Sequence, residues 1–265
     1  MNISQKVVVF DLDETLGNFI ELGMFCDALE NFNKKNISKA HFFELIDLFH
    51  ECLRPDILNI LSYLRNKKKQ GICQKIMIYT NNQGPRAWTE SISEYFDNKL
   101  KTKLFDNIVA AFKVRGKRIE LGRTSHDKTV NDLVSCTKIP NDTQICFLDD
   151  QYHPYMKHNN VYYINIKPYT YEFSFDEMAT RYYTAYKNKL PTDTTLIDFT
   201  KHIVDYMNGY ECDDKKKRSI LGLKMDKVIS KQILLHLKRF FGDNLSKTKR
   251  TKIKFNRKTK KKLLP

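Results

Sequence analysis

The chain has 265 residues, of which 41% are hydrophobic, and its formal net charge is +15 at pH 7. This apolar content can fill a sizeable core, which excludes a disordered chain, and the length allows one large domain or one domain with an appendage. No apolar run approaches the roughly 18 residues of a membrane span, and no signal leader precedes the first strand. We therefore expect a soluble intracellular protein, nuclear or cytoplasmic, without a membrane partner.

The positive charge is concentrated at the end of the sequence. Residues 243–265 carry a net charge of about +9, which leaves about +6 for the residues before them. Because this segment has few apolar residues, we expect a disordered basic tail that binds polyanions such as nucleic acid or acts as a nuclear-import signal. A tail that only improves solubility is the alternative.

The cysteines and histidines give no sign of a zinc site. The six cysteines form no Cys-x-x-Cys pair, and the seven histidines lack the spacing of metal ligands. Cys73 and Cys146 lie in or beside predicted strands, as small core residues do. We expect free, buried thiols.

The first predicted element is a short strand that runs directly into acidic residues. Residues 7–10 read Val-Val-Val-Phe, which is too short for a helix and typical of a strand buried on both faces. Because side chains two apart in an extended chain point the same way, we expect Asp11 and Asp13 to present both carboxylates to one spot. Such crowding favours a bound cation or one protonated carboxyl. An acidic turn that only caps the strand is the alternative.

The next elements alternate between helices and strands. Apolar residues at helical spacing predict an insert at 19–53, with Ser38 capping its second helix. A further helix begins at 54–56, where Pro55 is tolerated in the first turn. The remaining elements of this part are strands at 75–79, 108–114, 144–148 and 161–166, helices at 87–104 and 129–134, and a polar loop at 115–127.

After residue 170 the pattern is helical. Helices are predicted at 198–207 and 225–241, with a charged linker at 211–218 between them. The last helix places one set of apolar residues on a single face: Val228, Ile229, Ile233, Leu237 and Phe240. We expect this face to pack on the main domain rather than on a partner. The domain boundaries are then 1–170, 171–242 and 243–265.

These elements predict the fold class. Strands that alternate with helices indicate a Rossmann-like α/β fold, with a mostly parallel sheet, helices on both faces, a helical cap insert after the first strand and a helical C-terminal extension. The carboxyl ends of parallel strands share one edge, so residues as distant as Asp11, Thr80 and Asp150 converge there. The run Thr-Asn-Asn-Gln-Gly from Thr80 can hold a phosphate by hydrogen bonds, unless it is an ordinary polar loop.

The motifs resemble those of a known superfamily. Residues 11–15 read Asp-Leu-Asp-Glu-Thr, and Thr80, Lys128 and the Asp149-Asp150 pair follow in order after the expected strands. This is similar to the four-motif signature of the haloacid dehalogenase superfamily. The amino-acid sequence around residues 11–16 and 54–55 most resembles that of the phosphatases of the RNA polymerase II carboxy-terminal-domain and NLI-interacting-factor type. The resemblance covers residues 5–170 and omits the insert.

The resemblance implies a set of roles. Asp11 would be the nucleophile that forms an aspartyl-phosphate, and Asp13 the general acid and base. Thr80, Asn81 and Lys128 would bind the phosphate. Mg²⁺ would be the cofactor, bound by Asp11, the backbone carbonyl of Asp13, Asp149 and Asp150. Thr15 would brace the loop.

Three functions fit this reading. The first is a magnesium-dependent phosphatase, a phosphoric monoester hydrolase, that acts on phosphoserine or phosphothreonine in proteins. The second is a phosphatase of nucleic-acid ends, because residues 80–84 also resemble the Thr-Asn-Gln wording of DNA 3′-phosphatases, and the tail would bind backbone phosphates. The third is a binding protein that kept the fold without turnover. The sequence names neither the physiological substrate nor the oligomeric state.

Overall fold

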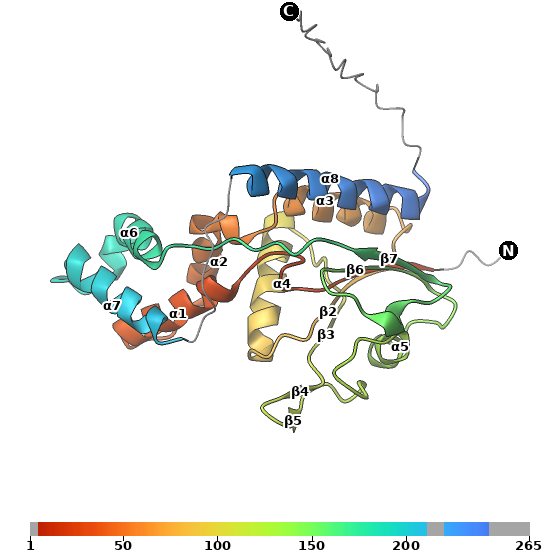
Figure 1. Ribbon diagram of the computed structural model, residues 1–265, viewed down its shortest axis with the longest axis horizontal. Helices are drawn as coiled ribbons and strands as arrows, with labels where there is room; N and C mark the ends of the chain where they lie inside the picture. The colour runs from red at the N-terminus through yellow and green to blue at the C-terminus, as the bar shows by residue number, and fades with distance from the viewer. Residues whose placement is uncertain (1–4, 211–219, 244–265) are drawn as a thin grey trace, which may run out of the picture.

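The computed structural model describes residues 5–210 and 220–243, and its centre is a five-stranded parallel sheet (Figure 1). Its order is β3-β2-β1-β6-β7, and every neighbouring pair is parallel. The strands are β1 Lys6–Phe10, β2 Lys75–Tyr79, β3 Asn107–Val109, β6 Gln144–Asp149 and β7 Val161–Asn165. The predicted α/β fold with a parallel sheet is confirmed.

The sheet is buried on both faces because its strands are continuously apolar. In β1, Val8 and Phe10 join one core cluster, whereas Val7 and Val9 join another. The first cluster includes the inner faces of α3 (Ile57–Lys69), α4 (Arg86–Leu100) and α8 (Ile220–Phe241), and the second includes α5 (Val130–Thr137). Helices thus cover both faces, as predicted.

The predicted insert at 19–53 is confirmed as an excursion from the end of β1. It contains α1 (Ile20–Asn33), α2 (Lys39–Leu48) and the 3₁₀ turn η1 (His50–Cys52). The side chain of Ser38 caps α2 by accepting a hydrogen bond from the His41 amide. The insert is closed at its base, where the Asn18 amide donates to the Cys52 carbonyl at 2.7 Å. A Cβ at Gly17 would lie 2.4 Å from that same carbonyl, so the closure requires glycine.

Two helices after the sheet extend the insert rather than the sheet. Helices α6 (Phe175–Tyr186) and α7 (Leu196–Asn208), joined through the 3₁₀ turn η3 (Lys187–Lys189), pack on each other, and α7 packs on α1. We call α1, α2, α6 and α7 the helical lobe; it lies at one end of the molecule, left in Figure 1. Its core is aromatic: Phe25 packs against Tyr182, which stacks on Phe199.

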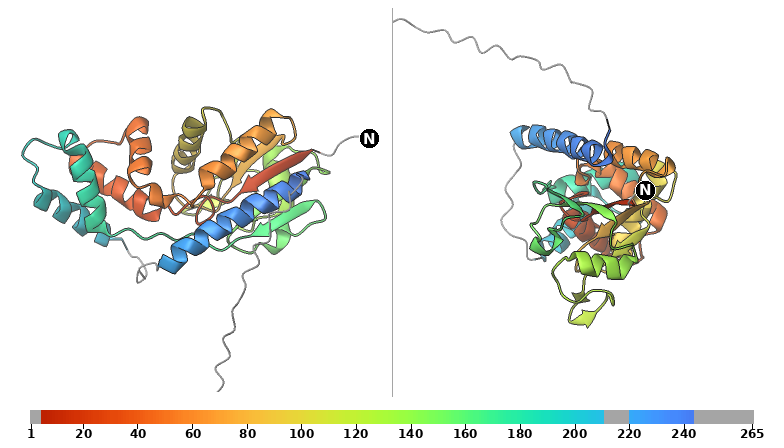
Figure 2. Two further views of the ribbon diagram at one scale, coloured as in Figure 1. Left: turned by 90° about the horizontal axis from the view of Figure 1, so that it is seen from above. Right: turned by 90° about the vertical axis from the view of Figure 1, so that its right-hand side faces the viewer.

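Helix α8 returns to the sheet, alongside α3 and β7, as both views in Figure 2 show. Ile233 and Leu237 are buried there, as predicted. The expected apolar face is wrong at Val228, which is 50% exposed, because α8 buries the face that carries Asp226, Ser230 and Ile233, and Val228 lies on the opposite side of the helix. The predicted linker at 211–218 and the tail from 244 lie outside the described residues.

Several boundaries differ from the prediction. The third strand ends at Val109 instead of residue 114, and an antiparallel hairpin of β4 (Lys113–Val114) and β5 (Lys117–Arg118) spans the end of the predicted strand and the start of the predicted loop. Arg115 and Gly116 at its tip both have positive φ, as a two-residue hairpin turn requires. Pro55 precedes α3 instead of lying within it, α4 ends at Leu100, and a short 3₁₀ turn, η2 (Pro154–Met156), precedes β7.

The structure also bears on the predictions about membrane spans and cysteines, within the residues that it describes. In the part of the chain that the structure describes, no helix combines the length and apolar character that a membrane span needs. Five cysteines fall within the described ranges and all are free thiols: Cys26, Cys52, Cys73, Cys136 and Cys146. Cys73 and Cys146 are buried, as expected.

Candidate active site at the carboxyl edge of the sheet

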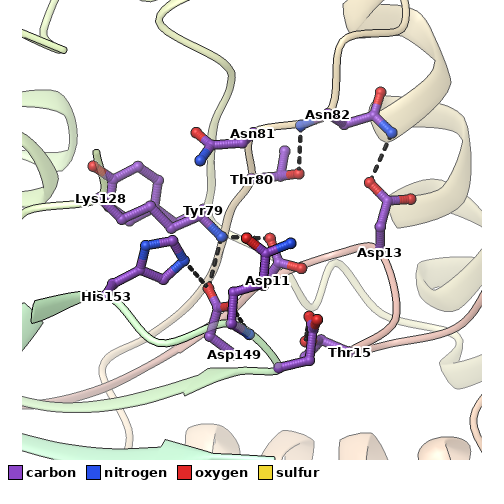
Figure 3. Close-up of polar contacts among 12 residues, drawn as sticks. Asp11, Asp13, Thr15, Tyr79, Thr80, Asn81, Asn82, Lys128, Asp149 and His153 are labelled. Carbon is purple, nitrogen blue, oxygen red and sulfur yellow. Dashed lines mark hydrogen bonds and ion pairs between the residues drawn. The ribbon is translucent and has the colours of Figure 1, made fainter. Parts of the chain in front are cut away.

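A small polar cavity of about 190 Å³ lies at the carboxyl edge of the sheet. It is lined by Asp11, Asp13, Glu14, Thr80, Asn81, Asn82, Lys128, Asp149, Asp150, Gln151 and His153. Every site residue that the sequence predicted is therefore among its lining residues. Figure 3 shows most of them converging from separate strand ends.

The strand register produces this convergence. Phe10 of β1 is level with Ile78 of β2 and with Leu148 of β6, so the three strands end within two residues of one another. The amide of Asp11 continues the ladder by donating to the Leu148 carbonyl at 2.9 Å. Asp11, Thr80 and Asp149 are consequently the first polar residues at the same edge.

Lys128 lies between two carboxylates. Its Nζ donates to Asp11 Oδ1 at 2.5 Å and to Asp149 Oδ2 at 2.7 Å (Figure 3). The lysine is 2% exposed and Asp149 is 1% exposed, so these ion pairs are shielded from water. Burial lowers the pKa of Lys128, but the two carboxylates outweigh burial and raise it overall. The lysine therefore stays charged.

The two acids that bind Lys128 have pKa values shifted in opposite directions. Burial raises the pKa of Asp11 to about 8, although Lys128 opposes that rise. Burial also acts to raise the pKa of Asp149, but His153 and Lys128 overcome it and hold that pKa below its usual value. His153 Nε2 lies 3.2 Å from Asp149 Oδ2, and the Gln151 amide donates to Asp149 Oδ1 at 2.8 Å. Of the two carboxyl groups, Asp149 therefore has the lower pKa and ionises more readily than Asp11.

Asp13 does not share the position of Asp11, although both line the cavity. β1 ends at Phe10, and the chain bends at the buried Leu12, so the extended-chain alternation expected for residues 11–13 is wrong in detail. The Asp13 carboxylate accepts a hydrogen bond from Asn82 Nδ2 at 2.7 Å (Figure 3). Burial is the main cause that raises its pKa.

The loop after β2 carries the predicted phosphate-binding residues. Thr80 is buried, and its Oγ1 accepts a hydrogen bond from the Asn82 amide at 3.0 Å, which folds the loop back over the strand end. Asn81 follows, and its Oδ1 is buried without a hydrogen-bond partner among the described residues. A buried amide oxygen is an acceptor, so it needs a hydrogen-bond donor or a cation to satisfy it.

Three acids form a set that can hold a metal ion. Asp11, Asp149 and Asp150 each offer a carboxylate oxygen, and these atoms lie within 4.8 Å of one another. Hard oxygen donors of this kind fit Mg²⁺ better than zinc or copper. Thr15 Oγ1 donates to Asp150 Oδ1 at 3.1 Å and so orients that ligand, in agreement with its expected bracing role. The Asp13 side chain lies outside this set, which leaves its backbone carbonyl as the predicted ligand.

Two buried arginines that the sequence analysis missed support the site. Arg54 is 1% exposed and donates to the carbonyls of Glu14, Thr15 and Lys167, at 2.5, 2.6 and 3.0 Å. It thereby joins the loop after β1 to the segment after β7. Carbonyl acceptors carry no side-chain signature, so only the unusual Arg-Pro start of the helix hinted at this arginine.

The second buried arginine is Arg123. It is fully buried, lies over the Tyr79 ring at 4.9 Å, and donates to the carbonyls of Thr80 and Ala110, at 3.2 and 2.9 Å. A second pair of donations reaches the carbonyls just before Lys128. Arg123 therefore fixes the loop that delivers the lysine.

No known protein-family model matches this chain, and no curated protein matches it. The resemblance to the haloacid dehalogenase superfamily remains an interpretation of the motifs and of their placement.

Proposed function

We propose that this chain is a magnesium-dependent phosphatase that works through an aspartyl-phosphate on Asp11. The observation that carries the proposal is Lys128 bonded to Asp11 and Asp149 in a cavity that Thr80 and Asn81 close from the neighbouring strand end. Phosphoryl transfer needs a nucleophile in line with the leaving oxygen and positive charge around the three other oxygens. These residues offer both.

The reaction has two steps. A carboxylate oxygen of Asp11 attacks phosphorus, the ester P–O bond breaks, and Asp13 gives its proton to the leaving oxygen. Asp13 then takes a proton from water, whose oxygen attacks phosphorus and releases inorganic phosphate and free Asp11. The separate position of Asp13, bonded to neutral Asn82 and not to Lys128, suits a proton donor beside the nucleophile.

Lys128, Thr80 and Asn81 hold the phosphoryl oxygens in this scheme. Asp11, Asp149 and Asp150 would hold Mg²⁺, with the backbone carbonyl of Asp13 as a further ligand. The metal, when bound, supplies positive charge that offsets the clustered carboxylates and the phosphate. His153 and Thr15 keep Asp149 and Asp150 in position.

Phosphoserine or phosphothreonine in a protein is the first candidate substrate. A second, larger cavity of about 730 Å³ lies between the insert and the start of α4, and it meets the polar cavity at Asp13 and Asn82. We call it the side groove. Its walls include Phe19, Phe42 and Trp88, and it also carries Asp27 and Glu30. Apolar walls with acidic groups fit a polypeptide better than a phosphodiester backbone, so the insert would set substrate choice.

A nucleic-acid end is the second candidate, and one observation favours it. The β4–β5 hairpin carries exposed cations at the same edge of the sheet. A catalytically silent binding protein is the third candidate, but a full set of nucleophile, proton donor, lysine and acids argues against it.

A substrate panel tests the proposal. We expect Mg²⁺-dependent release of phosphate from phosphopeptides or from 3′- or 5′-phosphorylated oligonucleotides, and from an aryl phosphate, with complete loss after chelation. Preference for phosphopeptides would support the first substrate class. A folded, magnesium-replete protein that hydrolyses none of these would leave the silent binding protein as the better reading.

The role of the insert in substrate choice is tested with the variant Ile20→Ser, because Ile20 is exposed and lies on the wall of the side groove. If the insert sets substrate choice, the ratio of peptide to aryl phosphate turnover should fall in this variant. Equal ratios in the variant and the wild type would count against that role.

A further inference from the structure

The β4–β5 hairpin is a concentrated, exposed source of positive charge. Four of the six residues from 113 to 118 are basic, and all four side chains are exposed: Lys113, Arg115, Lys117 and Arg118. None of the four forms an ion pair with an acid in the part of the chain that the structure describes. We call residues 113–118 the basic hairpin.

The basic hairpin is held in one conformation. Phe112 lies under Lys113 and Arg118, with ring centroids 5.0 and 5.4 Å from their cationic groups. Arg118 also donates to the carbonyls of Leu121 and Arg123, at 2.8 and 2.7 Å. At the tip, Arg115 has a φ of 48°, a left-handed conformation that side chains other than Gly, Asn and Asp seldom adopt. The turn thus fixes the backbone of Arg115 at the tip of the hairpin.

The same contacts connect the basic hairpin to the polar cavity. The Arg123 carbonyl that Arg118 binds belongs to the buried arginine that donates to the Thr80 carbonyl. Glu120, just after the hairpin, lies 3.7 Å from Arg86 at the start of α4, which follows the loop of Asn81 and Asn82. These contacts therefore fix the position of the basic hairpin relative to the loop of Asn81 and Asn82, which lines the cavity.

Two exposed aromatic rings lie on the loop after β6, the loop that also carries the lining residues Gln151 and His153. Tyr152 and Tyr155 are each 62% exposed, which is high for side chains of this size. Tyr152 lies between the lining residues Gln151 and His153 and stacks in parallel on Tyr163 of β7, with centroids 6.0 Å apart. One face of the Tyr152 ring is thus supported by the protein.

We infer that the basic hairpin, together with Tyr152 and Tyr155, forms a surface that binds single-stranded nucleic acid across the mouth of the cavity. Cations that follow the backbone and aromatic rings on which bases stack are the two components that such binding needs. An acidic polypeptide would also meet the cations, but it has no bases to stack on the rings. The inference goes beyond the proposed phosphatase activity, since it requires binding and not turnover.

The test uses the full chain and a fluorescent, unphosphorylated single-stranded oligonucleotide, with affinity measured by anisotropy over a range of salt concentrations. The hairpin variant carries Lys113→Gln, Arg115→Gln and Lys117→Gln. The matched control removes three exposed lysines from α8, on the opposite side of the molecule from the hairpin (Figure 1): Lys224→Gln, Lys227→Gln and Lys231→Gln. Both variants retain the basic residues after 243, so any binding by those residues is common to both.

We expect the hairpin variant to bind on the order of tenfold more weakly than the control, with a salt slope reduced by about 2, since each phosphate contact with a single strand contributes about 0.7. The double variant Tyr152→Ala, Tyr155→Ala should bind on the order of tenfold more weakly than wild type with an unchanged salt slope, because stacking involves no counterion release. Circular dichroism and thermal melting establish that each variant is folded.

Two results would overturn the inference. One is equal affinity of the hairpin variant and the α8 control. The other is competition by polyglutamate as effective as competition by the oligonucleotide, together with wild-type affinity in the tyrosine variant; this would assign the basic hairpin to an acidic protein segment instead.

Discussion

The carboxyl edge of the sheet and the helical lobe are stabilised in opposite ways. At the edge, Lys128, Asp11 and Asp149 are ionisable groups held almost entirely out of water, and the lysine is bonded to both acids. In the lobe, the buried contacts are between aromatic rings, as where Phe32 meets Phe199 with centroids 5.1 Å apart. Charged groups in the lobe lie mostly at its surface.

Because of this difference, substitutions in the two regions should have different consequences. A buried charge is retained at a cost in desolvation, which only its partners offset, so removal of one partner leaves the others uncompensated. Aromatic packing scales with buried area and tolerates change at its rim. Substitutions at the edge should therefore alter reactivity and stability sharply, whereas surface substitutions in the lobe should alter stability slightly.

The largest effect is expected from Asp11→Asn. The amide keeps the size of the side chain but removes the nucleophile, so turnover of any phosphate ester should fall on the order of 10⁴-fold or more. Steady-state release of phosphate with saturating Mg²⁺ measures this loss, and urea unfolding checks that the variant is folded. Substantial activity in Asp11→Asn would overturn the assignment of the nucleophile.

The variant Asp13→Asn separates the proposed role of Asp13 as proton donor from that of Asp11 as nucleophile. Attack by Asp11 remains possible, but proton transfer is lost, so turnover should fall by roughly 10² to 10⁴. The loss should be smaller for an activated aryl phosphate, whose leaving group needs little protonation. If both substrate types lose activity to the same extent, Asp13 acts in binding or folding rather than as a proton donor.

Arg54→Met and Arg181→Met compare the two regions directly. Arg54 is buried at the edge and donates to three carbonyls, and hydrogen bonds to a charged group contribute about 1.5–3 kcal/mol each. Its loss should reduce the free energy of unfolding by about 3 kcal/mol or more. Arg181 pairs with Glu51 and Glu177 at the surface of the lobe, and its loss should cost less than about 1 kcal/mol.

Urea titration of both arginine variants gives these values. The wild type is the reference, and a change in the slope with denaturant would reveal a change in the compactness of either end state. Similar losses for the two arginines would contradict the contrast between edge and lobe.

The smallest effect is expected from a surface cluster of the lobe. Hydrogen bonds from Lys189 and His41 lower the pKa of Glu44. Because the folded-state pKa is depressed, the stabilisation is present above the unfolded value of about 4.3 and is lost as the pH falls through the folded value. At pH 7, Glu44→Gln should lower Tm by no more than about 3 °C.

Thermal melting of Glu44→Gln and wild type from pH 7 to pH 3 measures this effect. The two Tm values should converge at the acidic end, and 1 M salt should narrow the difference at pH 7. A difference that is constant over the whole range would show that the carboxylate charge of Glu44 is not its cause.

The sequence by itself determined the strands and the polar residues that follow them. Residues 75–79 and 144–148 are short apolar runs, and a run of this kind is buried on both faces wherever it lies in a parallel sheet. Since parallel strands end at one edge, Asp11, Thr80 and Asp149 converge without any knowledge of their contacts. The cap by Ser38 was predictable for a similar reason, because it acts within its own helix.

The tertiary structure alone decided which partner each of these groups has. Asp11 and Asp13 have the same side chain two residues apart, yet one bonds to Lys128 and the other to Asn82 because the chain bends at Leu12. Arg54 and Arg123 bind backbone carbonyls, which every residue possesses and no sequence pattern marks. Val228 is exposed because α8 turns the face of Asp226, Ser230 and Ile233 inward, and this partly polar face is selected by packing against elements remote in the sequence.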